Sequence, residues 1–164
     1  MKLAGSGFEI RSAEGMDAAE IAAVLRRSIA ELCVADHNND PERLGSWLRN
    51  KTEETALGWI EGPGQVLVAV SQGSDRQLLG VGMALPAGEV VLNYVDPSAR
   101  YQGVSKALMW SLESYFTTIG VTHVSLRSTL TAERFYRSIG YVQSDIPLDP
   151  GDRAAAIFEK DLHP

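Results

Sequence analysis

The chain has 164 residues, of which 45% are hydrophobic and 22% are charged, a composition typical of one globular domain that can bury a sizeable core. Its formal net charge of -6 argues against a nucleic-acid-binding protein, because such proteins normally present a basic face. Cys33 is the only cysteine, so an internal disulfide is impossible and a reducing, cytoplasmic setting is expected.

Neither a targeting segment nor a membrane segment is predicted. Residues 1–7 lack the sustained apolar core of a signal peptide. The most apolar region, residues 18–35, is interrupted by four charged side chains, which argues against a membrane span: Glu20, Arg26, Arg27 and Glu31. We therefore expect a single domain over residues 1–164 with no membrane or nucleic-acid partner, and the oligomeric state, a homodimer included, stays open.

The N-terminal part predicts one strand followed by a helix. Residues 8–11 alternate apolar and polar side chains, as a half-buried strand does. Asp17 is the expected N-cap of the helix, with Glu20 three residues later as in a capping box. The apolar residues recur at helical spacing, at Ile21, Val24, Leu25, Ile29 and Leu32.

Residues 36–41 predict a loop that leads into a second helix. Asp40 suits the N-cap, and Pro41 suits the first helical position, where its missing N–H costs nothing. Leu44, Trp47 and Leu48 give this helix one apolar face. His37 has acidic neighbours, but no second His or Cys stands at a ligand spacing, so a solvated loop is favoured over a metal site.

Three strands follow, over residues 66–70, 78–85 and 89–95, separated by glycine-containing turns. Their spacing predicts an antiparallel meander. Residues 52–60 show no clear pattern and are left unassigned, apart from Trp59, which is expected to pack in the core.

The C-terminal part predicts a β–α–β unit and a further helix with two strands. An apolar stripe over residues 104–119 ends at Gly120, and residues 121–126 alternate as a strand, which favours a parallel pair with residues 89–95. Thr129 or Thr131 is the expected cap of a short helix that runs to Ile139. Residues 141–143 and 154–162 predict the last two strands.

The junction between residues 93 and 106 is the most informative stretch, because a strand, a polar turn and a helix meet there. The first turn of a helix leaves backbone N–H groups unpaired and carries the positive end of the helix dipole. Gly103 permits close approach to the main chain, and Arg100 and Lys106 add positive charge. An anion site and an ordinary capped connection are both compatible with these features alone.

Two known phosphate loops do not fit this junction. A Walker A loop needs Lys and Ser or Thr directly after its last glycine, whereas Val104 follows Gly103. A dinucleotide fingerprint needs three spaced glycines, and Gly103 is the only one there.

Two motifs instead resemble the GNAT superfamily of N-acetyltransferases. The first motif lies in residues 95–105, where Val-Asp-Pro is followed, after two residues, by Arg-Tyr-Gln-Gly-Val-Ser. It is similar to the pyrophosphate motif of the family, Arg/Gln-x-x-Gly-x-Gly/Ala, except that Ser105 stands at the last position. Residues 129–141 resemble its Asn-x-x-Ala-x-x-Phe-Tyr-x-x-x-Gly-Phe/Tyr segment, with Thr129 in place of Asn. The resemblance implies a mixed α/β (α+β) fold in the order β–α–α–β–β–β–α–β–α–β–β with splayed central strands.

The resemblance also implies a cosubstrate, acetyl-CoA, and the residues that bind it. The main chain of Tyr94 and Val95 would pair with the pantetheine amides, and Thr129, Ala132 and Tyr136 would lie along the other side. The pyrophosphate would be held by Arg100 and by the N–H groups of Tyr101, Gln102, Gly103, Val104, Ser105 and Lys106. No metal is implied.

Two residues are candidates for catalysis by this resemblance. Tyr136 would donate a proton or hydrogen bond to the leaving sulfur, and the N–H of Val95 would stabilise the oxyanion. Glu89 lies eleven residues before Arg100, the register of the base in histone-acetylating members, although an exposed carboxylate at a strand start is an equal interpretation. An ordinary glutamate and a lysine-like amine differ by about six pKa units, or roughly 8 kcal/mol, so either a raised glutamate pKa or a water relay would be needed.

The acceptor is expected to be an amine of a small molecule or peptide. The resemblance assigns its entrance to residues 32–47 and the turn at 86–88, where Glu31, Asp36 and Asp40 would favour a cation. The alternative function is a non-catalytic acyl-CoA sensor on the same fold, and an unrelated nucleotide-binding domain is disfavoured by the failed loop tests.

Overall fold

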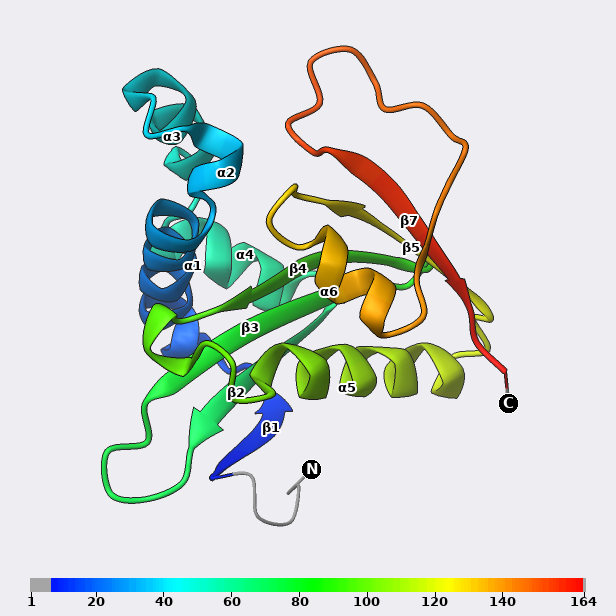
Figure 1. The fold of residues 1–164 in the computed structure, drawn as a ribbon. Coiled ribbons are helices and arrows are strands. Elements are labelled where there is room, and N and C mark those ends of the chain that lie inside the picture. Colours follow the sequence, from blue (N-terminus) through cyan, green and yellow to red (C-terminus); the bar gives the residue numbers. More distant parts are fainter. Residues whose placement is uncertain (1–6, 164) are drawn as a thin grey trace.

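The computed structural model describes residues 7–163 and contains, within them, a seven-stranded mixed sheet with helices on both faces (Figure 1). The sheet order is β1-β2-β3-β4-β5-β7-β6. The strands are β1 (Phe8–Ser12), β2 (Gln65–Ser71), β3 (Leu78–Leu85), β4 (Glu89–Val95), β5 (His123–Ser128), β6 (Val142–Gln143) and β7 (Ala156–Asp161). The predicted meander of β2, β3 and β4 and the parallel pair of β4 and β5 are both confirmed.

The helices that cover the sheet differ between its two faces. Before β2 come α1 (Ala18–Leu32), α2 (Val34–His37), α3 (Pro41–Leu48) and α4 (Glu53–Glu61); later come α5 (Val104–Thr118) and α6 (Glu133–Ser138), with single 3-10 turns at Gly15–Asp17 and Pro97–Ala99. Ile21, Leu25 and Ala56 pack α1 and α4 on one face, whereas Leu108 and Phe116 pack α5 on the other. The mixed architecture predicted from the sequence is therefore confirmed.

Two glycines of β3 bring α5 unusually close to the sheet. A Cβ at Gly80 would lie 2.9 Å from Val104 Cγ1, and one at Gly82 would lie 3.1 Å from Leu112 Cδ1. Since Val104 is the first residue of α5, this close packing fixes the N-terminus of the helix beside the end of β4.

The segment between α1 and β2 is more helical than the sequence predicted. Asp36 and His37 lie in α2, so the loop prediction for them is wrong. His37 is also not solvated: its side chain is only 1% exposed, with Nε2 3.0 Å from the Ile29 carbonyl oxygen and Nδ1 accepting from the Asn39 amide. Burial of the ring within α1 and α2 is the physical reason for the difference.

Of the two predicted caps near the N-terminus, one differs from expectation in part and one agrees. Asp17 is the N-cap residue of α1 as predicted, but its side chain makes no capping bond, because the carboxylate binds the Arg11 guanidinium at 2.8 Å and accepts from the Glu14 amide. Asp40 does cap α3, by accepting from the Glu42 amide. The unassigned residues 52–60 mostly form α4, which Thr52 caps through the Thr55 amide, and Trp59 packs against the core as predicted.

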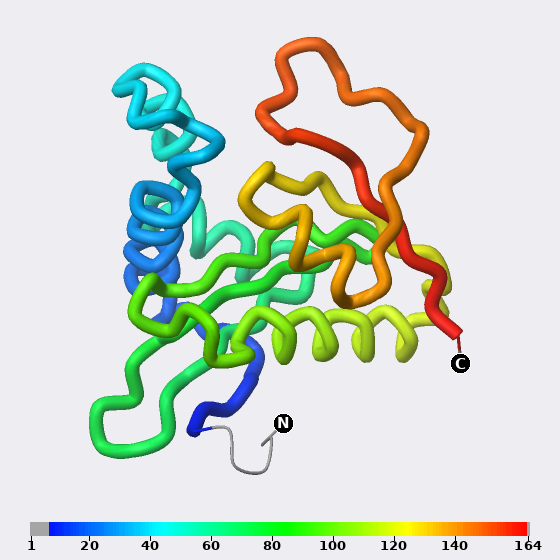
Figure 2. The backbone as a smooth tube through the Cα atoms, viewed as in Figure 1, coloured from blue at the N-terminus to red at the C-terminus, as the bar shows by residue number. Residues whose placement is uncertain are grey.

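The C-terminal helix and strands begin later than predicted. The first helical residue of α6 is Glu133, and neither threonine is its N-cap residue, although Thr129 Oγ1 accepts from the Ala132 amide at 3.2 Å. Residues 144–155 form an irregular loop that returns to β7 (Figure 2). The helix and strands were expected to begin earlier because local sequence preference alone cannot show which residues belong to this loop.

The two halves of the sheet separate at β4 and β5. Their pairing is restricted to Glu89 with Ser125 and Val90 with Leu126. Beyond Val90 the two strands diverge, and α6 lies beside the opening (Figure 1). The splayed central strands implied by the family resemblance are therefore present.

Candidate active site

The open edge of β4 offers main-chain groups to the space between the diverging strands. The Asp96 amide donates to the Leu79 carbonyl of β3 at 2.7 Å. Because backbone groups alternate in direction along a strand, those of Tyr94 also face β3, whereas those of Asn93 and Val95 face the opening. The prediction that the Tyr94 main chain is available is corrected on this point; Asn93 was missed, and the alternation about Val95 could have found it.

A run of unpaired amides follows the end of β4. Within residues 7–163, the six consecutive N–H groups from Tyr101 to Lys106 make no hydrogen bond, and the Ala107 amide is the first to donate, to Gly103 O at 3.0 Å. Tyr101 and Gly103 adopt left-handed backbone angles, with φ of 65° and 80°. Concave runs of free amides at a helix N-terminus bind anions.

One cavity of about 590 Å³ joins the strand opening to these amides. Ten of the eleven predicted cofactor-binding residues line it: Tyr94, Val95, Arg100, Tyr101, Gly103, Val104, Ser105, Lys106, Thr129 and Ala132. The eleventh, Gln102, does not, because its side chain turns back to donate to the Ser98 carbonyl. Cys33 also lines this cavity, and burial raises its pKa to about 12, so the thiol stays protonated near neutral pH.

A polar chain of three side chains crosses the opening. Ser105 Oγ donates to Asn93 Oδ1 at 3.1 Å, and Asn93 Nδ2 donates to the Tyr136 hydroxyl oxygen at 3.3 Å. Tyr136 lines a narrow space of about 40 Å³ together with Asn93 and Thr129. Burial raises the pKa of Tyr136 to about 12, and the bond from Asn93 offsets this only in part, so the phenol is neutral at physiological pH.

Glu89 lies apart from Tyr136. It is at the paired start of β4, and its Oε1 accepts from Arg127 Nη1 at 2.8 Å, while Arg127 Nε also donates to Asp152. Glu89 borders a separate cavity of about 380 Å³ that Tyr136 does not line. Glu89 and Tyr136, the two candidate catalytic residues, therefore line different cavities. Arg127 lies between them, because it lines both cavities.

A comparison with protein families identifies the family to which this chain belongs. Residues 45–149, more than half of the chain, match the family described as the acetyltransferase (GNAT) domain. The chain belongs to the GNAT family of acetyltransferases. As a GNAT protein it is an acyltransferase enzyme, and the family uses acetyl-CoA.

Solved structures with the same fold accompany this GNAT match. A GCN5-related N-acetyltransferase from Rhodopseudomonas palustris is 22% identical over 99% of this chain and 100% of its own, with a TM-score of 0.82. PaiA N-acetyltransferase from Thermoplasma acidophilum, solved in complex with coenzyme A, is 22% identical over 94% of this chain and 98% of its own, with a TM-score of 0.75. Aminoglycoside 6'-acetyltransferase type Ii is 20% identical over 95% of this chain and 98% of its own, with a TM-score of 0.69. A search of curated proteins found no match.

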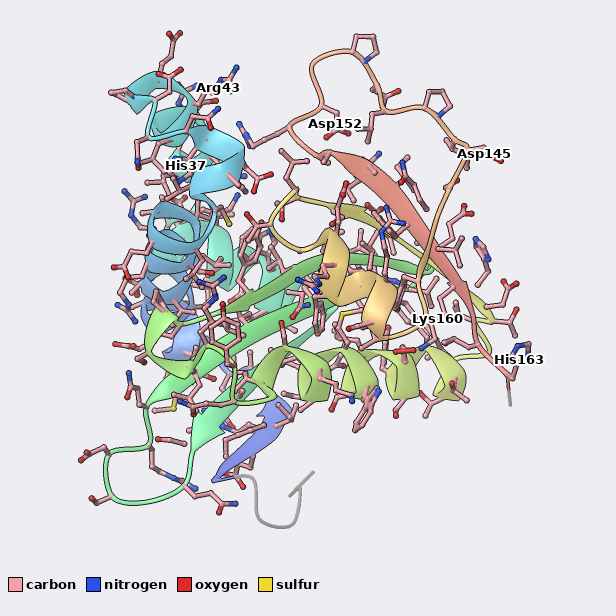
Figure 3. All side chains as sticks on the ribbon, viewed as in Figure 1. His37, Arg43, Asp145, Asp152, Lys160 and His163 are labelled. Atoms are coloured by element: carbon pink, nitrogen blue, oxygen red, sulfur yellow. The ribbon has the colours of Figure 1, made fainter. Side chains whose placement is uncertain are left out.

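A second large cavity, of about 630 Å³, lies between α2–α3 and the loop before β7 in this GNAT domain. Figure 3 shows Arg43 and Asp152 on these two opposing segments. The cavity is lined mainly by charged side chains: Asp36, Asp40, Glu42, Arg43, Asp152 and Arg153. Glu31 and the turn at residues 86–88, both predicted at the acceptor entrance, do not line it, whereas residues 151–153 do and were missed.

Metal sites and membrane-spanning helices are both absent from the described residues. No group of three or more His, Cys, Asp or Glu side chains in residues 7–163 is arranged to hold a metal ion. No helix in the same range is long and apolar enough to cross a membrane. The predicted absence of a signal peptide concerns residues 1–7, of which 1–6 lie outside the described part.

Proposed function

We propose that the protein transfers the acetyl group of acetyl-CoA directly to a primary amine of a small molecule or peptide. The observation that carries this proposal is the single cavity that joins six free amides, from Tyr101 to Lys106, to the unpaired edge of β4. A diphosphate and an amide-containing arm are the chemical groups that such a surface complements.

The cofactor-binding roles follow from these groups. The six amides bind the pyrophosphate, and Arg100 and Lys106 add positive charge at the same end of the cavity. The Val95 main chain and the Asn93 carbonyl pair with the pantetheine amides, and Gln102 contributes only its backbone N–H. Thr129 and Ala132 form the opposite side of the cleft. When bound, acetyl-CoA supplies the activated acetyl thioester.

The backbone at the strand opening stabilises the oxyanion. We assign this role to the Asn93 N–H, in place of Val95, because Asn93 lies at the same narrow space as the Tyr136 hydroxyl. The carbonyl carbon and the leaving sulfur are adjacent atoms, so their protein partners must be neighbours as well. This assignment leaves the Val95 N–H for the pantetheine arm.

Tyr136 stabilises the departing sulfur by hydrogen bonding. Its hydroxyl oxygen already accepts from Asn93, so the hydroxyl hydrogen is the part that can point to the substrate. With a Tyr136 pKa of about 12 and an ordinary thiol pKa of about 8.5, complete transfer of this proton would cost roughly 5 kcal/mol. Tyr136 therefore keeps its proton and donates a hydrogen bond, so coenzyme A leaves as the thiolate while the proton that the amine loses goes to the base.

Glu89 is proposed to accept the amine proton through water. Direct contact is disfavoured because the Glu89 carboxylate is already engaged by Arg127 and borders a different cavity. The amine itself enters from the charged cavity between α2–α3 and residues 151–153. A primary amine in its cationic form is attracted by the carboxylates there and must lose a proton before it attacks.

The test is release of free thiol from acetyl-CoA in the presence of a panel of lysine peptides, peptide N-termini, polyamines, aminoglycosides and amino acids. We expect release with at least one class, and slower release in the Tyr136→Phe and Glu89→Gln variants. Tight binding of coenzyme A without release across the whole panel would instead favour the alternative, a non-catalytic acyl-CoA sensor. Unchanged turnover in both variants would refute the catalytic roles alone.

A further inference from the structure

A single carboxylate connects two segments that are far apart in the sequence. Asp36, in the four-residue helix α2, accepts hydrogen bonds from the Leu130 amide at 2.7 Å and the Thr131 amide at 3.3 Å. It also accepts from Thr131 Oγ1 at 2.6 Å. Both carboxylate oxygens are thus engaged by the loop between β5 and α6, and none of the roles described above uses this contact.

The contact spans the cofactor cleft. One wall of the cleft is formed by the end of α1, with Leu32 and Cys33, and the other by Thr129, Thr131 and Ala132. Asp36 follows three residues after Cys33 and binds residues 130 and 131 of the opposite wall. The Asp36 carboxylate therefore connects the two walls at this end of the cleft.

The same residue lies at the boundary of the two large cavities. Asp36 lines the charged cavity, whereas its partner Thr131 lines the cofactor cleft. Because α2 has only four residues, its own backbone bonds give it little independent stability. Contacts to other segments must hold it in place, and Asp36 supplies three of them.

We propose that Asp36 is a positioning residue that sets the width of the cofactor cleft and joins it mechanically to the charged cavity. The inference rests on the proposed function, since it assumes that coenzyme A occupies this cleft. The three hydrogen bonds that the Asp36 carboxylate accepts all come from residues 130 and 131, which fits a positioning role, and the pH profile of the Asp36→Asn variant distinguishes it from a catalytic base.

The test measures coenzyme A affinity by calorimetry in the full chain. Loss of the carboxylate in Asp36→Asn leaves amides of the opposite wall without their charged acceptor, and we expect roughly tenfold weaker binding, equivalent to about 1.4 kcal/mol. Thr131→Val removes only the hydroxyl bond and is expected to weaken binding about threefold. The double variant should be no weaker than Asp36→Asn, because both changes remove one shared contact. Asp145→Asn, an equal charge change in an exposed loop, is the control.

The outcomes separate this inference from the proposed function. Absence of coenzyme A binding in the unmodified protein would refute the proposed function. Normal binding in the unmodified protein together with normal binding in both single variants would refute the role of Asp36. A lower kcat and an altered pH profile in Asp36→Asn, with unchanged affinity, would make it a base and overturn the inference. If Asp36→Asn does not fold, the coenzyme A affinity of Thr131→Val alone tests the inference, because the predicted threefold loss of affinity in that variant still applies.

Discussion

The cofactor cleft and the charged cavity are lined by different kinds of chemical group. The cofactor cleft presents backbone groups, at Asn93, Val95 and residues 101–106, whose directions are set by a strand and a helix N-terminus. The charged cavity presents side chains of α2, α3 and the loop before β7. A site made of main chain changes little when side chains change, whereas a site made of surface side chains can change with every substitution. This difference explains why the donor of the reaction could be inferred and the acceptor could not.

The largest effect is expected from reversing charge in the cofactor cleft. Lys106→Glu places a carboxylate beside the free amides, where it competes with a diphosphate, and we expect at least a hundredfold loss of coenzyme A affinity by calorimetry. An acidic residue in the first turn of α5 favours the helix by about 0.3–1 kcal/mol, so the melting temperature should not fall. Lys106→Gln should give an intermediate affinity. Retained affinity in Lys106→Glu would show that the amides do not bind a phosphate.

The next largest effect is expected from Tyr136→Phe. Removing the hydroxyl leaves the cleft intact but removes the donor to sulfur, so kcat should fall by about 100-fold while the KM for acetyl-CoA changes less than about twofold. Tyr141→Phe is the matched control, because the Tyr141 hydroxyl is buried and has no hydrogen-bond partner among the described residues. Equal activity of the two variants would contradict the assignment.

A smaller and more selective effect is expected in the charged cavity. Arg153 donates to Ser46 Oγ at 3.1 Å and lies 5.7 Å from the Trp47 ring centroid, which links the loop before β7 to α3. Arg153→Ala should change the KM for the acceptor, once one is known, by about three- to tenfold through altered charge and loop position. Coenzyme A affinity should stay within about twofold, and a parallel loss of both would show that the cavities are not separate.

The smallest effect concerns stability at acidic pH near the cofactor cleft. Burial alone would raise the pKa of Asp96, but hydrogen bonds from Ser98 and the Arg27 guanidinium outweigh it, and the pKa is lowered from 3.8. A lowered folded-state pKa stabilises the fold above the unfolded value and loses that contribution as pH falls below it. Because the Arg27 side chain is 43% exposed, Asp96→Asn should cost only about 0.5–1 kcal/mol at pH 7, and less as the pH falls below 3.8, measured by urea unfolding. A cost that does not fall with the pH would contradict this.

The cavity beside the free amides of residues 101–106 was predictable because its structural requirements are local. Gly103, with its left-handed backbone, and the amphipathic stripe of α5 mark a strand, turn and helix within twenty residues. Ten predicted cofactor-binding residues accordingly line one cavity. Tyr94 was assigned incorrectly because the direction of a backbone group depends on its pairing with β3, which the sequence does not display.

The rest of the site depends on contacts between distant segments. The helix around Asp36 and His37 forms because His37 is buried on α1, and the sequence shows only a polar stretch typical of a loop. The ion pairs of Arg127 with Glu89 and Asp152 join residues 25 to 38 positions apart, and no local pattern predicts them. The division of Glu89 and Tyr136 between two cavities follows from these pairs.

The short ladder between β4 and β5 has a consequence for the empty protein. The backbone groups of Asn93 and Val95 that face β5 lack a neighbouring strand, yet β4 is an internal strand of the sheet and not an edge that another chain could extend. Their amide hydrogens should therefore exchange rapidly with deuterated solvent and become protected when ligand arrives. Isotope uptake at Asn93 and Val95 would thus record occupancy of the enzyme before any acceptor has been identified.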